Sequence, residues 1–205
     1  MRIELRYGAL AGSEITMKTF ILFLFIAMTP VLHAAAAEQT PEQVRQTQDK
    51  IRQGTSAILD TLYGIAPSSR KQIAAAYGYA VFSSFGMKLM VAGGGNGKGM
   101  AVSHKPKREV FMKMVSVQAG LGFGIKQTQL VFVFKTRQAF DQFVNSGWEV
   151  GGQVSVAATD GSGGLAIDGA VAVAPGVWLY QMTEKGLAAE LAVKGTKFYQ
   201  DASLN

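Results

Sequence analysis

The hydrophobic positions that follow residue 40 recur every three or four residues. Within the range 41–63 they are Val44, Ile51, Ile58 and Leu62. This spacing predicts an amphipathic helix, and Thr40 followed by a proline is typical of a helix start. Such a helix either lies on a membrane or covers a sheet. Because its polar face mixes both charge signs and lacks bulky aromatic residues until Tyr63, we expect it to cover a sheet. A second, shorter helix is predicted over 67–77.

From Gly78 onward the pattern changes to short apolar runs with a period of two, separated by glycine-rich turn signals, which predicts strands. The runs are 79–85, 88–92, 99–103, 110–125, 129–134, 153–159, 165–173, 177–182 and 187–194. Strands this close in sequence pair antiparallel, because parallel neighbours need long crossovers. One helix interrupts them over 136–144, with Thr136 as its cap and Phe140 and Phe143 on its buried side. The pattern predicts an α+β fold.

Residues 91–100 read VAGGGNGKGM and resemble a phosphate-binding loop at first sight. In the pattern G-x-x-x-x-G-K-[ST], however, the first glycine would fall on Ala92 and the hydroxyl residue on Gly99. No helix signal follows, although a phosphate loop is built on a helix N-terminus. The dinucleotide pattern G-x-G-x-x-G fails as well. A nucleotide site is therefore not expected here.

The same stretch is expected to be a hairpin turn between two strands. Asn96 and Gly97 are predicted at its tip with positive φ angles, because Asn-Gly favours two-residue β-turns. Lys98 then points to solvent, and Met100 and Val102 share one face of the returning strand.

Residues 117–125 read VQAGLGFGI and are predicted to form one strand. Its apolar side chains point to one face, and Gly120, Gly122 and Gly124 lie on the other. Three positions without side chains permit close approach by another backbone, an aromatic ring or a ligand. A packing groove for a helix, or a strongly coiled sheet, is the favoured interpretation, and a binding surface is the alternative.

The N-terminal part has the pattern of a secretory signal peptide. Met17 and Lys18 precede an apolar core and a small-residue region that ends at Ala37. The apolar run is too short to span a bilayer comfortably. We expect Met17 to be the initiator, residues 1–37 to be an over-called start plus signal peptide, and residues 38–205 to form a single domain. The chain contains no cysteine, so a lipidated form is excluded and a periplasmic or secreted protein is expected.

Composition and chemistry give little support for an enzyme. Of the 205 residues, 48% are hydrophobic and 17% charged, which is typical of a globular domain. Without cysteine, and with His104 as the only histidine after the predicted signal peptide, a zinc site is not expected. No serine stands in a G-x-S-x-G elbow. A hydrolase would have to use Asp168, Glu149 and His104 as its catalytic residues. We therefore expect no catalytic residues, no metal and no cofactor.

The charge balance favours an anionic partner. The formal net charge is +6, and from residue 38 onward 17 Lys and Arg outnumber 12 Asp and Glu. Such a surplus attracts lipid headgroups, nucleic acid or acidic protein, of which nucleic acid is not expected for an exported protein. The candidate contacts are Arg70, Lys71, Lys105, Lys107 and Arg108. The alternative interpretation of the run at 104–108 is a solvated loop without a binding role.

Five segments together resemble the SYLF domain, also known as a lipid-binding or actin-binding domain of yeast endocytic proteins. They are 74–82 (AAAYGYAVF), the glycine run 93–99, 119–134 (AGLGFGIKQTQLVFVF), 140–156 with its Gly-Trp-Glu-Val-Gly core, and the closing 186–197. The resemblance covers roughly residues 45–200 in the order of the family. It implies N-terminal helices packed on a curled, barrel-like, largely antiparallel sheet with one inserted short helix.

The resemblance also implies a binding function. Eukaryotic members bind phosphoinositides and other membranes, and some bind actin, whereas bacterial members are commonly exported. For this chain we expect a non-enzymatic envelope protein that binds anionic phospholipid surfaces. Actin binding is not expected. The alternative is a structural or interaction module that accepts a protein segment or a hydrophobic small molecule at the glycine-faced strand.

Overall fold

The computed structural model describes residues 39–89, 92–119, 124–150, 169–184, 186–187 and 195–205. These residues belong to one compact unit that begins at Gln39. Its helices are α2 (Pro41–Ile65), α3 (Ser68–Ala75) and α4 (Arg137–Ser146). Its strands are β1 (Gly78–Leu89), β2 (Ala92–His104), β3 (Lys107–Ala119), β4 (Gly124–Phe134), β5 (Trp148–Val150), β6 (Val171–Ala174), β7 (Val177–Thr183), β8 (Gly186–Leu187) and β9 (Thr196–Gln200).

All three predicted helices are present within the described residues. Thr40 caps α2 through a capping box with Gln43, in which the Gln43 amide donates to Thr40 Oγ1 and the Thr40 amide donates to Gln43 Oε1. Thr136 caps α4, because its side chain accepts from the Ala139 amide. Phe140 and Phe143 of α4 are buried, as expected.

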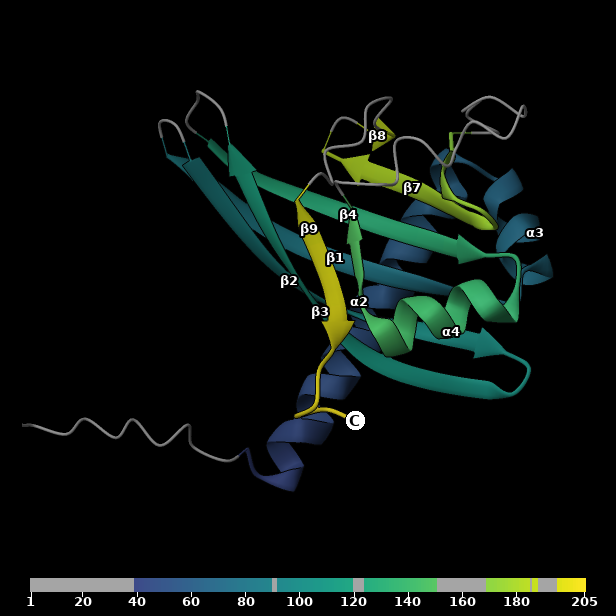
Figure 1. Cartoon of the computed structure of the whole chain (residues 1–205), viewed down its shortest axis with the longest axis horizontal. Coiled ribbons are helices and arrows are strands. Elements are labelled where there is room, and N and C mark those ends of the chain that lie inside the picture. The colour runs from purple at the N-terminus through teal and green to yellow at the C-terminus, as the bar shows by residue number, and fades with distance from the viewer. Residues whose placement is uncertain (1–38, 90–91, 120–123, 151–168, 185, 188–194) are drawn as a thin grey trace, which may run out of the picture. The chain divides into compact units, whose positions relative to one another are not determined.

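The described strands form one antiparallel, strongly curled sheet, which confirms the α+β prediction (Figure 1). The strand order is β5-β9-β3-β2-β1-β4-β7-β6, and β8 pairs with β7. The four long strands β3, β2, β1 and β4 pair over most of their length. They form the central part of the sheet, between α2 and α4 in the picture.

The alternation of side chains along the strands separates two buried faces. Phe82, Phe132 and Phe134 point to the face that α4 covers, where they pack with Phe140 and Phe143. On the opposite face, Val81, Val131 and Tyr180 pack against the apolar stripe of α2, which consists of Ile58, Leu59 and Leu62. The helix therefore covers a sheet, as its mixed-charge polar face predicted.

The expected hairpin turn at Asn96-Gly97 is wrong. Both residues lie inside β2, where Asn96 stands opposite Phe85 of β1 and Val115 of β3. Nor does Gly97 belong to the glycines with positive φ among the described residues. The other details are confirmed, since Lys98 is exposed and Met100 and Val102 belong to the same buried cluster.

Close packing, rather than a turn, requires glycine in this part of β2. A Cβ atom added at Gly99 would overlap the Val81 carbonyl oxygen and the Phe82 ring. At Gly97 an added Cβ would meet the Ser83 carbonyl oxygen and the side chain of Met114. Strongly curled neighbouring strands bring these groups too close for any side chain.

The prediction of one strand over 117–125 is also wrong. β3 ends at Ala119, β4 begins at Gly124, and β2 and β1 stand between these two strands in the sheet. β3 and β4 run in opposite directions, so the chain reverses between them. Gly120 and Gly122 lie outside the described residues, and Gly124 is the first residue of β4. The three glycines therefore do not share one described strand.

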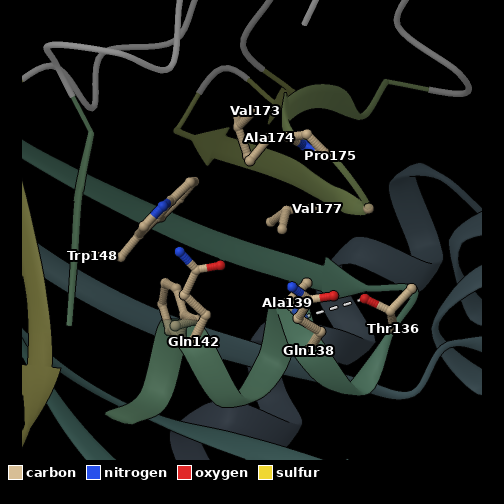
Figure 2. Close-up of a pocket in the computed structure, with 11 residues that line it drawn as sticks. Thr136, Gln138, Ala139, Gln142, Trp148, Val173, Ala174, Pro175 and Val177 are labelled. Atoms are coloured by element: carbon tan, nitrogen blue, oxygen red, sulfur yellow. Dashed lines mark hydrogen bonds between the residues drawn. The ribbon is translucent and has the colours of Figure 1, made fainter. Parts of the chain in front are cut away.

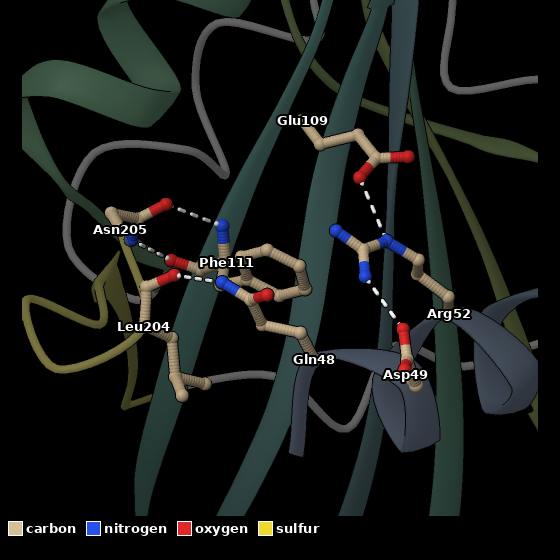
Figure 3. Close-up of polar contacts among 7 residues, drawn as sticks. All are labelled: Gln48, Asp49, Arg52, Glu109, Phe111, Leu204 and Asn205. Atoms are coloured by element: carbon tan, nitrogen blue, oxygen red, sulfur yellow. Dashed lines mark hydrogen bonds and ion pairs between the residues drawn. The ribbon is translucent and has the colours of Figure 1, made fainter. Parts of the chain in front are cut away.

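Polar contacts tie α2 and the C-terminal residues to β3 (Figure 3). Arg52 of α2 pairs with Glu109 of β3 at 2.9 Å and with Asp49 at 2.8 Å, and its guanidinium lies 5.1 Å from the centre of the Phe111 ring. Asn205 exchanges two hydrogen bonds with the Phe111 backbone. Arg52, Asp49 and Glu109 therefore all have ion-pair partners within the fold, and the pair of Arg52 with Glu109 joins α2 to β3.

Candidate functional site

At one end of the sheet, paired residues form a row that runs across the strands. In register, Arg108 of β3 stands opposite Ser103 of β2, Ser103 opposite Gly78 of β1, Gly78 opposite Phe134 of β4, and Phe134 opposite Val177 of β7. The segments just beyond this row continue the pairing through backbone hydrogen bonds. The turn between β2 and β3 and the connection from β4 to α4 are therefore brought to the same end of the molecule.

Helix α3 lies at this same end (Figure 1, right). His104, the last residue of β2, donates a hydrogen bond from Nε2 to the Ile73 carbonyl oxygen at 3.1 Å. Its amide donates to the Tyr77 carbonyl oxygen, and the Tyr77 amide donates to Phe134. His104 thus joins the β2–β3 turn to α3, a structural role that leaves its ring engaged with the protein.

Six cations gather at this end, which we call the basic end. They are Arg70 and Lys71 of α3, Lys105 in the β2–β3 turn, Lys107 and Arg108 at the start of β3, and Lys135 after β4. All six are exposed, and none forms an ion pair with a carboxylate among the described residues. The first five were singled out in the sequence. Lys135 was not, because it is a single lysine between Phe134 and Thr136 and only the sheet brings it to the others.

The described carboxylates nearest in sequence to the β2–β3 turn and to Lys135 are already engaged. Glu109 follows Arg108 but pairs with Arg52 on the α2 side of the sheet. Asp141 pairs with Arg137 at 3.1 Å within α4. The positive charge of the basic end is therefore left without a neutralising partner in the described part of the chain.

An apolar groove of about 440 Å³ borders the basic end. It lies between α3 and the β4–β7 part of the sheet and is lined by Gln72, Ala75, Ala76, Val133, Lys135 and Trp178. The Lys135 ammonium stands 4.7 Å from the centre of the Trp178 ring, within cation–π range. Lys71 precedes Ala75 by four residues and so lies on the same stripe of α3. Lys135 thus lies against the indole in the groove lining, and Lys71 stands on the helix stripe that borders the groove.

Arg70 packs in a similar way on the Tyr63 ring, with its guanidinium 4.2 Å from the ring centre. Burial raises the pKa of the Tyr63 phenol, and the Arg70 charge offsets part of that increase. The phenol therefore remains neutral at physiological pH.

A second groove, of about 650 Å³, lies between α4 and the β6–β7 turn (Figure 2). Its walls include Phe143, Trp148, Val173 and Val177, with the amide of Gln142 at the rim. No charged side chain belongs to its described lining. It therefore lacks the groups that would hold an anion, in contrast to the basic end.

The residues considered for hydrolysis are not brought together by the described structure. Glu149 is exposed on β5, an edge strand that β9 and β3 separate from β2, the strand that carries His104. Asp168 lies outside the described residues. Within the described ranges, no three His, Cys, Asp or Glu side chains are placed to hold a metal ion. None of the described helices combines the length and the apolar character needed to cross a membrane.

Residues 115–205 match the family model Ysc84, described as "Las17-binding protein actin regulator". Ysc84 is a model of the SYLF domain, and its match covers 91 of the 205 residues of this chain. This confirms the family resemblance found in the sequence.

The chain is also similar to the beta cell expansion factor A of Aeromonas veronii. It is 32% identical over 164 residues, which cover 80% of this chain and 61% of the relative. The aligned region thus spans about three fifths of that protein. SYLF domains form a family of binding domains.

Proposed function

We propose that this SYLF domain protein binds anionic phospholipid surfaces through its basic end, without catalysing a reaction. The proposal includes export to a bacterial envelope, which the signal-peptide pattern of residues 17–37 supports, and there phosphatidylglycerol and cardiolipin provide such a surface. Actin regulation, which the family description names, is not part of the proposal, because no actin is expected in that compartment.

The observation that carries the proposal is the gathering of six exposed cations without carboxylate partners at one end of the sheet. Three elements contribute them, so the fold, and not one basic run, builds the cluster. Each Lys or Arg near an anionic surface contributes about 1 kcal/mol. Several cations acting together give reversible binding that weakens with salt.

The groove beside the basic end supports the same function. Trp178 and Lys135 lie together at its wall, and an indole next to a cation suits the boundary between headgroups and acyl chains. Pairing of Arg70 with Tyr63 offers a second aromatic–cation contact on the same side.

Flotation with vesicles tests the proposal. We expect the protein to float with phosphatidylglycerol vesicles at low salt, to bind phosphatidylcholine vesicles much less, and to lose binding as salt rises. The double variant Lys105→Gln/Lys107→Gln should weaken binding by about 2 kcal/mol, or roughly thirtyfold.

The matched control is Arg45→Gln/Lys197→Gln, which removes the same charge from exposed positions outside the basic end. It should bind nearly as well as the unchanged protein. Equal flotation with neutral and anionic vesicles, or equal losses in both double variants, would contradict the proposal.

A further inference from the structure

Helix α2 contains a glycine that packing does not require. Gly54 stands near the middle of this 25-residue helix, where glycine is less favourable than alanine. A Cβ atom added there would meet nothing within 4 Å. This contrasts with Gly97 and Gly99 of β2, where an added Cβ overlaps neighbouring atoms. The absence of a side chain at residue 54 leaves space open.

That space belongs to a groove of about 390 Å³ between α2 and the strands β1 and β2. Its lining includes Lys50, Gly54 and Ile58, which are spaced four residues apart and share one stripe of the helix. The sheet contributes Ser83 and Lys98, which stand opposite each other in the β1–β2 ladder. A side chain at residue 54 would extend from the same stripe and narrow the groove.

The groove carries positive charge that the described fold does not neutralise. Lys98 stands directly opposite Lys113 of β3, and like charges in such a pair are unfavourable. Lys113 is stabilised by Asp201, 2.7 Å from its ammonium. Neither Lys98 nor Lys50 forms an ion pair with a described carboxylate. Of these three lysines, only Lys113 has a described carboxylate partner.

A second hollow extends the charged region along the sheet. It measures about 470 Å³ and shares Ser83 and Lys98 with the first. Lys113 and Tyr199 line it further on. A cross-strand row of Ser83, Lys98, Lys113 and Tyr199 therefore presents hydroxyls and ammonium groups side by side.

We infer that this groove is a binding site for a phosphate group, held by Lys50 and Lys98 and by the Ser83 hydroxyl. Ammonium groups bind phosphate oxygens through charge-assisted hydrogen bonds, which are stronger than neutral ones. Gly54 keeps the entrance open, which explains a helix glycine that no packing contact requires. The phosphate can be free or can belong to a lipid headgroup, because both present the same oxygens.

The site is separate from the basic end. Ser83 and Lys98 lie five residues along β1 and β2 from Gly78 and Ser103, which mark the row at the basic end. The inference therefore goes beyond the proposed membrane contact, and each can fail without the other.

Titration of the ¹⁵N-labelled protein at constant ionic strength tests the site, with the amide resonance of Thr55, a residue of the groove lining, as readout. The probes are inorganic phosphate and, below its micelle concentration, dihexanoyl phosphatidylglycerol. We expect a saturable shift with at least one of them. A saturable shift with inorganic phosphate shows that free phosphate is sufficient for binding. A saturable shift with the lipid but not with inorganic phosphate shows that the site requires the glycerol ester of the headgroup.

Variants assign the shift to the groove. Lys50→Gln/Lys98→Gln should weaken binding about tenfold or more, because two charge-assisted contacts are lost. Lys105→Gln/Lys107→Gln, with the same change of net charge at the basic end, should leave it unchanged. Gly54→Leu should obstruct the groove, whereas Gly54→Ala should retain binding and raise the Tm.

Two results would overturn the inference. One is no saturable shift with either probe, and the other is unchanged affinity in both Lys50→Gln/Lys98→Gln and Gly54→Leu, with the Tm of each variant showing that it is folded. Vesicle flotation of the same variants separates this outcome from a failure of the basic end.

Discussion

The two ends of the β2–β3 hairpin differ in what their lysines, arginines and glycines contact. At the turn end, Lys105, Lys107 and Arg108 are exposed and have no carboxylate partner in the described structure. Toward the other end, Gly97 and Gly99 are required by close contacts with neighbouring strands. Lys113 on the same part of β3 pairs with the buried carboxylate of Asp201.

This contrast separates residues that the fold needs from residues that are free for a partner. A glycine or lysine whose neighbours lie in contact is constrained by packing, so its substitution changes stability. A cation that contacts only solvent contributes little to folding. Several such cations close together therefore point to an external anion as their partner. The predictions that follow sharpen this separation, in order of expected effect on stability.

Gly99→Ala should be the most destabilising change. The added Cβ would overlap the Val81 carbonyl oxygen and the Phe82 ring, so the free energy of unfolding should fall by about 3 kcal/mol. Gly94→Ala is the matched control in the same strand, because its Cβ would stand 3.6 Å from the Ser116 carbonyl oxygen, an ordinary contact. Urea unfolding compares the two. Similar losses of stability would show that glycine in β2 does not reflect the contacts at residue 99.

Asp201→Asn should have an intermediate effect that depends on pH. Burial acts to raise the pKa of Asp201, but hydrogen bonds from Lys113 and Ser203 outweigh it and hold the pKa below its ordinary value. A lowered pKa in the folded state stabilises the protein above the unfolded pKa of about 3.9. This contribution is lost as the pH falls through the lower, folded pKa.

We therefore expect Asp201→Asn to lower the free energy of unfolding by about 2 kcal/mol at pH 7. The difference from the unchanged protein should shrink below about pH 4, where the carboxylate itself becomes protonated. Chemical unfolding at both pH values measures it. A difference that stays constant with pH would mean that the ion pair with Lys113 does not stabilise the fold.

Neutralising the turn end should have the smallest effect on stability. Lys105→Gln/Lys107→Gln/Arg108→Gln removes three exposed cations without ion pairs, so the free energy of unfolding should change by no more than about 0.5 kcal/mol. Relief of mutual repulsion favours a slight gain. A loss comparable with that of Asp201→Asn would show that these residues have a structural role and would weaken their assignment to a partner.

The helices were the elements that sequence periodicity predicted most closely. In α2 and α4 the apolar spacing, the threonine caps and the buried residues all agree with the prediction. Local rules suffice there, because a helix forms its backbone hydrogen bonds within one segment. The end of α2 differs by only two residues from the expected range.

The strands with many glycines were predicted less well. Asn-Gly at residues 96 and 97 has the composition of a turn but lies in β2, and the continuous alternation over 117–125 concealed a reversal between β3 and β4. Glycine permits both a turn and a close backbone contact. Only the neighbouring strands distinguish the two, and their identity is not encoded nearby in the sequence.

By itself, the sequence determined the helices, the antiparallel α+β class, the resemblance to the SYLF domain and the excess of cations. Tertiary structure alone decided that Lys135 joins the cations of α3 and the β2–β3 turn, and that Lys50 faces Lys98 across a groove kept open by Gly54. The reason is that helix periodicity and strand alternation are properties of one segment. Which charges become neighbours depends on the register and curl of strands that are distant in the chain.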